Sequence, residues 1–251
     1  MCLIALAWRA HPRYPLIVVA NRDEFHDRPA APLAEWPDAP GLYGGRDLRA
    51  GGAWLALSGG GRLAAVTNVR EPQPAPAGLR SRGALATGFL QGAASAPEAA
   101  QGLMDEAGRF GAFNLLLSDG QTLSYASNRP EPRWQPVAPG VHAISNAGLN
   151  TPWPKTLRLR AALQAWLDEG REEVEPLFTA LADDRAPADA ELPDTGVGLD
   201  LERLLAPPFI RSARYGTRAS SVVLLGPEGW RFEERRFGPD GVALGASALS
   251  G

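Results

Sequence analysis

The feature that most constrains the fold is a series of paired apolar runs, each pair joined by residues that favour a tight turn. Such pairs predict β-hairpins, because alternating apolar residues make half-buried strands and Gly, Pro, Asn or Asp make the turn between them. The pairs are residues 2–9 with 15–20 around HPRYP, GAWLALS with LAAVTNVR around the glycines at 59–61, FNLLLSDG with TLSYAS around Asp119-Gly120, and RASSVVLLG with GWRFEERRF around GPEG. VHAISN adds a further strand. Antiparallel sheet is therefore expected at both ends and in the middle of the chain.

Helical patterns lie between these hairpins. Apolar side chains at helical spacing predict a helix from residue 155, with Leu159, Leu163, Trp166 and Leu167 on one face. Composition predicts further helices over residues 81–94, 97–108, 173–182 and 199–205, and surface loops over 21–47 and 183–198. Strands in hairpins with clustered helices favour an α+β fold over a βαβ alternation, and two stacked antiparallel sheets flanked by helices fit this order.

Composition places limits on the function. The chain has 251 residues, of which 45% are hydrophobic, and we expect one domain over residues 1–251. Its net charge of −3 argues against a nucleic-acid partner, and no run of about 18 apolar residues predicts an integral membrane span. A single cysteine allows no intrachain disulfide, so the cytoplasm is the expected location. Lys155 is the only lysine, which we attribute to a general bias toward arginine.

That single cysteine directly follows the initiator methionine. Cells commonly remove Met1 when the next residue is small, and removal would leave Cys2 with both a thiol and a free α-amine. Those two groups make a self-contained nucleophile and base. Cys2 also begins an apolar run, where a free cysteine often packs as a small hydrophobic residue. Position alone leaves both interpretations open.

Other sites are excluded by their missing motifs. The three histidines are far apart in sequence and only one cysteine is present, so we expect no metal site. Phosphate-loop, serine-elbow and dinucleotide motifs are absent. What remains is four polar clusters at the ends of apolar runs: ANRDE at 20–24, TNVR at 67–70, SNAGLNTPWPK at 145–155 and YGTRASS at 215–221. Each alone is typical of turns, whereas together with Cys2 they could supply the donors and charges of amide hydrolysis.

These residues carry a family resemblance over nearly the full chain. The sequence resembles the NRDE family, homologues of the transport and Golgi organisation protein, through MCL, NRDE, GGxW, TNxR, SNAxLxTPWPK and YGTR in that order. That family is assigned to the N-terminal nucleophile hydrolase superfamily. The resemblance therefore implies a four-layer αββα sandwich and, by analogy with cysteine acylases, a site that cleaves a linear amide, a non-peptide C–N bond.

The resemblance also implies roles for particular residues. Cys2 is the expected nucleophile, with its α-amine as base and Asp23 holding that amine. Asn146 and Asn68 are expected to donate hydrogen bonds to the oxyanion, and Arg218 to lower the pKa of the thiol. The expected ligand-binding residues are Asn21, Arg22, Glu24 and Trp54. One departure is that Ala20 stands close to where the acylases have an arginine.

Structural roles are the alternative for each of these residues. Arg22 and Asp23 could form local ion pairs at a strand end, and Arg218 could be a buried partner of Asp23. Trp54, with Trp36 and Trp153, could simply pack in the core and loops.

A second function stays open beside the hydrolase. Members of the family resemble haem-handling or lipid-handling proteins, which move a hydrophobic ligand without chemistry on it. Cys2, His26 or His142 could then ligate haem iron, although no C-x-x-C-H motif for covalent attachment is present. The expected ligand is accordingly a small-molecule amide or a hydrophobic compound (haem, lipid or acyl compound), with no cofactor required.

Overall fold

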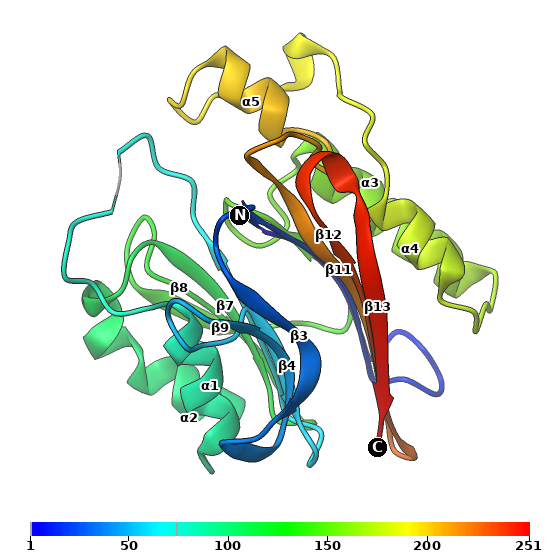
Figure 1. Ribbon diagram of the computed structural model, residues 1–251. Coiled ribbons are helices and arrows are strands. Elements are labelled where there is room, and N and C mark those ends of the chain that lie inside the picture. The colour runs from blue at the N-terminus through cyan, green and yellow to red at the C-terminus, as the bar shows by residue number, and fades with distance from the viewer. Residues whose placement is uncertain (1, 74) are drawn as a thin grey trace. The chain divides into compact units, whose positions relative to one another are not determined.

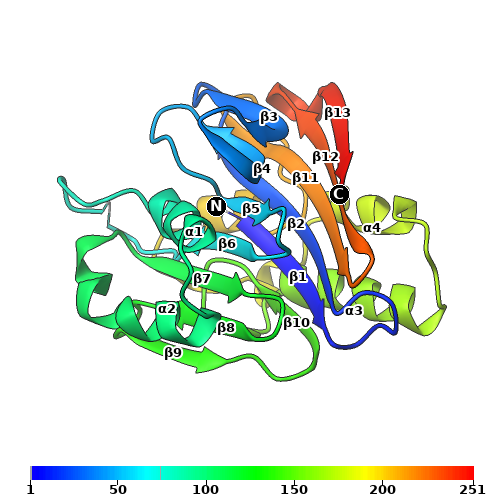
Figure 2. The same ribbon diagram turned by 90° about the horizontal axis from the view of Figure 1, so that it is seen from below.

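The computed structural model describes residues 2–73 and 75–251, so the predicted removal of Met1 lies outside the described residues. Contacts between residues divide the chain into two compact units. The first unit comprises residues 2–27, Arg70–Pro72 and Pro139–Ser250, and the second comprises Arg28–Val69 and Gln73–Ala138. Each unit contains one antiparallel sheet and its own helices, as the α+β expectation requires (Figures 1 and 2).

The sheet of the first unit has six strands in the order β10-β1-β2-β11-β12-β13. Their bounds are β1 Cys2–Trp8, β2 Leu16–Phe25, β10 Gly140–Ile144, β11 Tyr215–Gly226, β12 Gly229–Phe237 and β13 Ala243–Ser250. The predicted β1–β2 and β11–β12 hairpins are confirmed by their antiparallel ladders. Strand β11 also pairs with β2, which brings residues about 200 positions apart in sequence side by side.

Helices cover one face of this sheet. They are α3 Pro154–Asp168, α4 Glu175–Leu181 and α5 Leu199–Leu205, and Figure 1 shows α3 and α4 along the side of β11. The predicted apolar stripe of α3 is confirmed, because Leu159, Leu163 and Trp166 are buried against alternate residues of β1, β2 and β11. Short 3₁₀ turns lie at Asp189–Glu191 and Pro239–Gly241. The helix face of the sheet is thus the one that carries Leu3 and Val19.

The second unit has a seven-stranded sheet in the order β3-β4-β5-β6-β7-β8-β9. The strands are β3 Ala30–Trp36, β4 Ala39–Asp47, β5 Leu55–Ser58, β6 Leu63–Asn68, β7 Phe113–Ser118, β8 Leu123–Ser127 and β9 Arg133–Pro136. Helices α1 Gly83–Gln91 and α2 Ala96–Gly102, with the 3₁₀ segment Met104–Arg109, bury Phe89, Leu90 and Ala100 against it (Figure 2). The β5–β6 and β7–β8 hairpins are as predicted.

Residues 21–47 are not the loop that their prolines and glycines predict. Strand β2 continues to Phe25, and β3 and β4 form a further hairpin. The sheet accommodates the prolines because β3 is an edge strand, where a missing N–H costs no ladder bond, and its register shifts between Ala31 and Ala34 around Pro32. The predicted helix 97–108 is also shorter, since α2 ends at Gly102 and a 3₁₀ segment follows. Strands β9 and β13 were not anticipated.

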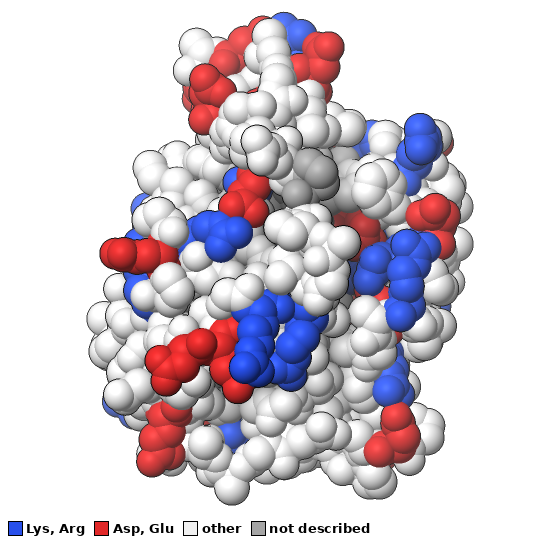
Figure 3. All heavy atoms as spheres, turned by 90° about the vertical axis from the view of Figure 1, so that its left-hand side faces the viewer, with Lys and Arg blue, Asp and Glu red and all other residues white. Residues whose placement is uncertain are grey.

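Surface charge and helix length give two further facts. On the face shown in Figure 3, acidic and basic groups lie next to one another among neutral surface. Within residues 2–73 and 75–251, every helix is too short or too polar to cross a lipid bilayer.

Candidate active site

Cys2 is the first residue of β1 and is only 6% exposed. It pairs with Arg22 of β2, while its neighbour Leu3 pairs with Asn21 on the helix-covered face. Because side chains alternate along a strand, Cys2 and Arg22 share the opposite face. Burial raises the pKa of the Cys2 thiol above its usual value, and the nearby Asp23 charge raises it further, whereas Arg22 and a hydrogen bond from the Asp23 backbone lower it. The buried sulfur is therefore a neutral thiol at neutral pH unless a base or a cation acts on it.

Asp23 lies near the end of β2 and is 1% exposed. The hydroxyl of Thr217, opposite it on β11, donates a hydrogen bond of 2.7 Å to Asp23 Oδ1 and accepts one of 2.9 Å from the backbone N–H of Ile210. Burial raises the pKa of Asp23, and the charge of Lys155 and the Thr217 hydrogen bond oppose that rise. Two strands therefore hold this carboxyl group in one orientation.

Asn146 follows β10 and is 1% exposed. The Ser145 hydroxyl lies 2.9 Å from the carbonyl oxygen of Cys2 and 3.1 Å from Asn146 Oδ1. The backbone N–H of Arg70 donates a 2.7 Å hydrogen bond to the Asn146 carbonyl. Since Oδ1 is the end of the amide that faces Ser145, Nδ2 is the end that offers hydrogen-bond donors. Ser145 thus links the backbone of the candidate nucleophile to the side chain of the candidate oxyanion donor.

Lys155 joins this cluster from the first turn of α3. Its side chain is 2% exposed, and Nζ donates a 3.0 Å hydrogen bond to the carbonyl oxygen of Leu205, the last residue of α5. Burial lowers the pKa of Lys155 to about 8, against the opposing charges of Asp23, Cys2 and Glu202. An ammonium group is thus held in the interior of the first unit, near the carboxyl group of Asp23.

A buried ion pair lies next to Lys155. Arg70 and Glu202 form it with side chains that are each 4% exposed. Glu202 also accepts a 3.0 Å hydrogen bond from the backbone N–H of Thr195, and the Arg70 guanidinium lies 4.7 Å from the centre of the Trp153 ring. Burial lowers the pKa of Arg70, although Glu202 opposes this. Trp153 therefore packs against the Arg70 guanidinium, which agrees with the packing role considered for it from the sequence.

The remaining predicted residues of the first unit have other contacts. The Asn21 side chain makes hydrogen bonds within the fold. Its Nδ2 donates to the carbonyl oxygens of Leu181 and Pro208 at 2.8 and 2.9 Å, and its Oδ1 accepts from the Ser220 hydroxyl at 2.6 Å. Glu24 Oε1 accepts a 2.8 Å hydrogen bond from the backbone N–H of Phe25.

Arg218 lies where the β2–β11 register shifts between Thr217 and Ala219. Its Nη1 donates to the Phe25 carbonyl at 2.8 Å, and burial and the charge of Arg22 lower its pKa. The cation that acts on the Cys2 thiol from β2 is Arg22. The role proposed for Arg218 at the thiol remains a prediction.

Two predicted residues belong to the second unit. Asn68 is the last residue of β6, and Trp54 immediately precedes β5, where its carbonyl accepts a 2.8 Å hydrogen bond from the backbone N–H of Val66. Their proposed roles as oxyanion donor and ligand contact remain predictions.

Five residues of the cluster were not among the sequence candidates, namely Arg70, Ser145, Lys155, Glu202 and Thr217. Four of them do lie in or beside the quoted polar motifs, which is a signal that could have found them. Glu202 lies in a short helix whose sequence, LDLERLL, resembles an ordinary solvated helix. Among the described residues, no group of three or more Cys, His, Asp or Glu side chains is placed to hold a metal ion.

Two solved structures resemble most or nearly all of the chain in fold. One is a Caenorhabditis elegans N-acylethanolamine-hydrolyzing acid amidase ortholog, with a TM-score of 0.51 and 9% identity over 89% of this chain and 92% of that one. The other is a cysteine-to-alanine variant of the conjugated bile acid hydrolase from Clostridium perfringens, with a TM-score of 0.52 and 8% identity over 99% and 92%. These likenesses show the N-terminal nucleophile hydrolase-like fold that the resemblance implied.

Sequence comparison gives the family. The chain is 30% identical to the mouse transport and Golgi organization 2 homolog over 249 residues, and 32% identical to the human homolog over 252. Both alignments cover 91% of this chain and 90% of the relative. The Drosophila melanogaster protein is 27% identical over 259 residues. The sequence model of the transport and Golgi organisation 2 family matches residues 1–239, and the chain belongs to that family.

Proposed function

We propose that this protein is a cysteine amidohydrolase of the cytoplasm, which cleaves the C–N bond of a linear, non-peptide amide through Cys2. The observation that carries the proposal is the bridge made by Ser145, which joins the Cys2 carbonyl and the Asn146 side-chain amide. A nucleophile and an oxyanion donor that are held by one hydroxyl group have a fixed relation to each other, which is what amide hydrolysis requires. The fold likeness to an amidase and to a conjugated bile acid hydrolase supports it.

The first half of the reaction would transfer the acyl group to sulfur. Once Met1 is removed, the α-amine of Cys2, with an ordinary pKa of about 7.7–8.0, accepts the thiol proton. The sulfur attacks the carbonyl carbon, and the resulting oxyanion receives hydrogen bonds from Asn146. When the C–N bond breaks, the leaving nitrogen takes the proton from the α-ammonium and departs as an amine, which leaves a thioester on Cys2.

The second half would release the acid. The α-amine takes a proton from water, the hydroxide adds to the thioester carbonyl, and the C–S bond breaks to give a carboxylic acid and the Cys2 thiol. Asp23 suits the part of holding the ammonium formed in both steps, because its carboxyl group is buried next to Cys2 and oriented by Thr217. Burial raises the pKa of Asp23, and a nearby cation lowers it. Protonation of the α-amine therefore favours ionisation of Asp23, and ionised Asp23 favours the protonated amine.

The non-catalytic alternative is binding of a hydrophobic ligand. A cavity of about 270 Å³ in the second unit, lined mainly by apolar residues of α1, α2 and β7, offers such a ligand a place. In that case the polar cluster around Cys2 would have no chemical role. Of the two histidines considered as haem ligands, His26 has a contact of 3.2 Å from Nε2 to the carbonyl of Ser212, and His142 one of 2.9 Å from Nδ1 to Asn150.

The test compares wild type with Cys2→Ala on a panel of N-acyl amides. We expect wild-type protein without Met1 to release amine and to form an acyl adduct that intact mass spectrometry detects on the chain. Cys2→Ala should lose the adduct and reduce turnover on the order of 10⁴-fold or more. Ser124→Ala, which removes a buried hydroxyl from β8 of the second unit, is the matched control and should turn over as wild type.

Two outcomes would reject the proposal. One is turnover that survives in Cys2→Ala, and the other is wild-type protein that lacks Met1 and yet shows neither turnover nor adduct with any amide of the panel. A haem titration followed at the Soret band runs in parallel. Saturable binding by both wild type and Cys2→Ala, with no turnover by either, would instead favour the ligand-binding alternative.

A further inference from the structure

We propose that the outer edge of strand β13 is an interface at which two copies of this protein pair antiparallel about a two-fold axis and join their six-stranded sheets. The proposal concerns oligomerisation and goes beyond the proposed function. It begins from the position of β13, Ala243–Ser250, as the outermost strand of the first unit's sheet (Figure 2). An edge strand directs the N–H and C=O groups of every second residue away from its sheet, where another β-strand can bind them.

The edges at β10, β3 and β9 are protected against such pairing. On the outer side of β10, the backbone N–H of Ala143 donates to Asn150 Oδ1 at 3.1 Å, and the Ala143 carbonyl accepts from the Asn150 N–H at 2.8 Å. Strand β3 contains Pro32 and pairs irregularly with β4. Strand β9 has four residues, of which the last is Pro136. A covering loop, prolines and short length are the usual protections of sheet edges.

Strand β13 lacks these protections. Its sequence, ALGASALS, contains neither a charged residue nor a proline. From Gly245 to Ser250 it keeps an unbroken register with β12, and the one shift in register lies before Gly245. Within residues 2–73 and 75–251, the strand that pairs with β13 is β12, and no loop or turn forms a backbone hydrogen bond with its other side. The outer side of β13 is therefore a regular row of backbone donors and acceptors.

The side chains along this edge are small or apolar and lie open to solvent. Val242 and Leu244, at the beginning of the strand, are 61% and 57% exposed. Ala246 and Ala248 are exposed as well, and their methyl groups do not obstruct an approaching strand. A long edge strand of this kind, without charge, is a typical site of association between chains. Pairing there would also remove apolar surface of Val242 and Leu244 from water, which favours association.

A second copy of β13 is the partner that suits this strand. In an antiparallel pair about a two-fold axis, a residue at the axis faces its own copy, so a charge there would face a like charge. The lack of charge along residues 243–250 removes that repulsion, and a net charge of −3 leaves little repulsion between whole molecules. The strand lies beyond residues 1–239, which the family model matches, so family membership does not imply this interface.

The first experiment maps the pairing by disulfide cross-linking in a Cys2→Ala background, where each variant carries one cysteine. Ala246→Cys, Ser247→Cys and Ala248→Cys cover the middle of the regular part of β13, where a two-fold axis pairs the most residues. The residue at the axis has its Cα about 4.5–5.5 Å from that of its copy, whereas its neighbours are about 8 Å from theirs. We expect mild oxidation to cross-link one variant efficiently, and Ala34→Cys, an exposed control on β3, to stay monomeric. Equal cross-linking of all variants, or of none, would overturn the proposal.

The second experiment measures association by sedimentation velocity between about 1 µM and about 1 mM protein. One strand pair buries little area, so we expect a weak dimer with a dissociation constant on the order of 10–100 µM. The double variant Ala246→Lys, Ala248→Lys places like charges near the axis and should stay monomeric throughout, whereas Ala34→Lys on β3 should dimerise as wild type does.

Wild-type protein that is monomeric at every concentration would overturn the proposal, as would dimerisation of the folded lysine variant at wild-type strength. The cross-linking experiment decides the matter if that variant does not fold. Neither measurement uses a substrate, so the interface and the proposed hydrolase can fail separately.

Discussion

The two units differ sharply in the polar groups that they bury. Among the described residues, those that are both charged and buried as whole residues are Arg22, Asp23, Lys155, Glu202 and Glu234, and all five belong to the first unit. The second unit buries neutral polar side chains, such as Asn114 and Asn128, which are bonded within it. Both units have an antiparallel sheet with helices on one face, so the architecture alone does not require buried charge.

Fold stability alone does not account for this difference. Burying an ionised group costs several kcal/mol unless it is paired, and a neutral amide achieves the same structural connections at lower cost. In the second unit Asn128 accepts a hydrogen bond from the Phe113 N–H and donates to the carbonyls of Ala107 and Phe110. In the first unit two of the buried charged residues, Arg22 and Asp23, act on the Cys2 thiol instead. The comparison agrees with the site proposed at the polar end of β1 and β2.

The largest expected effect tests whether the buried charges depend on one another. Arg70→Met removes the partner of Glu202, and because it leaves a carboxylate buried we expect a loss of about 3–5 kcal/mol in the free energy of unfolding. Chemical denaturation measures it. The double variant Arg70→Met, Glu202→Met should recover much of the loss, since it removes both charges. A loss below about 1 kcal/mol in the single variant would mean that water reaches Glu202.

The next effect belongs to the second unit and should affect stability alone. Asn128→Ala removes the hydrogen bonds that Asn128 makes with the Phe113 N–H and with the Phe110 carbonyl, so we expect a loss of about 2–3 kcal/mol on denaturation. The pH midpoint for ionisation of the Cys2 thiol, followed by the ultraviolet absorbance of its thiolate, should stay at its wild-type value. If Asn128→Ala shifts that midpoint, the division between a functional polar cluster and a structural one is wrong.

A smaller effect concerns a charged group of the second unit that is not deeply buried. Burial acts to raise the pKa of Asp119, but hydrogen bonds from the backbone N–H groups of Ala96, Thr122 and Gln121 outweigh it and lower the pKa to about 2. A depressed carboxyl pKa stabilises the fold above its unfolded value of 3.8 and loses that contribution as pH falls toward about 2.

The variant Asp119→Asn should therefore be less stable than wild type at neutral pH. The difference is about 1 kcal/mol once solvent screening of this mostly exposed group is allowed for. Urea denaturation at several pH values should show that difference shrinking between about pH 4 and pH 2. A difference that is independent of pH would assign the effect to the turn geometry and not to the charge.

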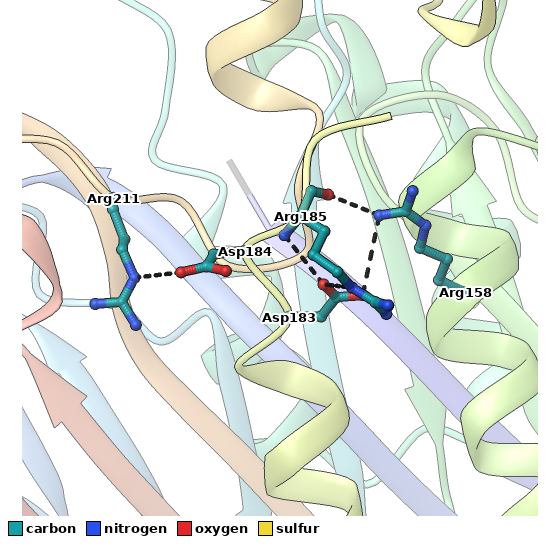
Figure 4. A network of polar contacts seen from close by, with 5 residues as sticks. All are labelled: Arg158, Asp183, Asp184, Arg185 and Arg211. Atoms are coloured by element: carbon teal, nitrogen blue, oxygen red, sulfur yellow. Dashed lines mark hydrogen bonds and ion pairs between the residues drawn. The ribbon is translucent and has the colours of Figure 1, made fainter. Parts of the chain in front are cut away.

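The smallest effect is expected at the exposed network after α4, shown in Figure 4. Asp184 forms an ion pair of 2.8 Å with Arg211, and both side chains are about half exposed. Exposed pairs contribute little, so Asp184→Asn should change the free energy of unfolding by less than about 1 kcal/mol. It is also the exposed counterpart of the Arg70 experiment. A loss as large as that of Arg70→Met would remove the contrast between buried and exposed charge.

Local patterns were enough to predict much of the fold. The β5–β6 hairpin follows from two apolar runs around the glycines at 59–61, and α3 follows from its apolar stripe. Strands β3, β4, β9 and β13 were missed because their stability comes from pairing partners. Pro32 is typical of loops in sequence, and only the sheet edge makes it acceptable in a strand.

The site could be predicted less completely. Cys2, Asp23 and Asn146 were proposed from motifs at strand ends, and all three are buried in the first unit. Lys155 was not found, because the lack of any other lysine was attributed to a general bias toward arginine. In addition, its ammonium group is buried against the end of α5, about 50 positions away in sequence, which no local pattern indicates. Arg70 and Glu202 are 132 positions apart, so no local pattern relates them.

The burial of Lys155 also decides how the chain can be modified. Because it is the only lysine and is 2% exposed, the folded surface presents no side-chain amine to labelling reagents or to conjugating enzymes. A reagent selective for primary amines should thus act almost entirely at the first residue of the chain. Such selective chemistry would report directly whether that residue is Met1 or Cys2, which is the distinction on which an N-terminal nucleophile depends.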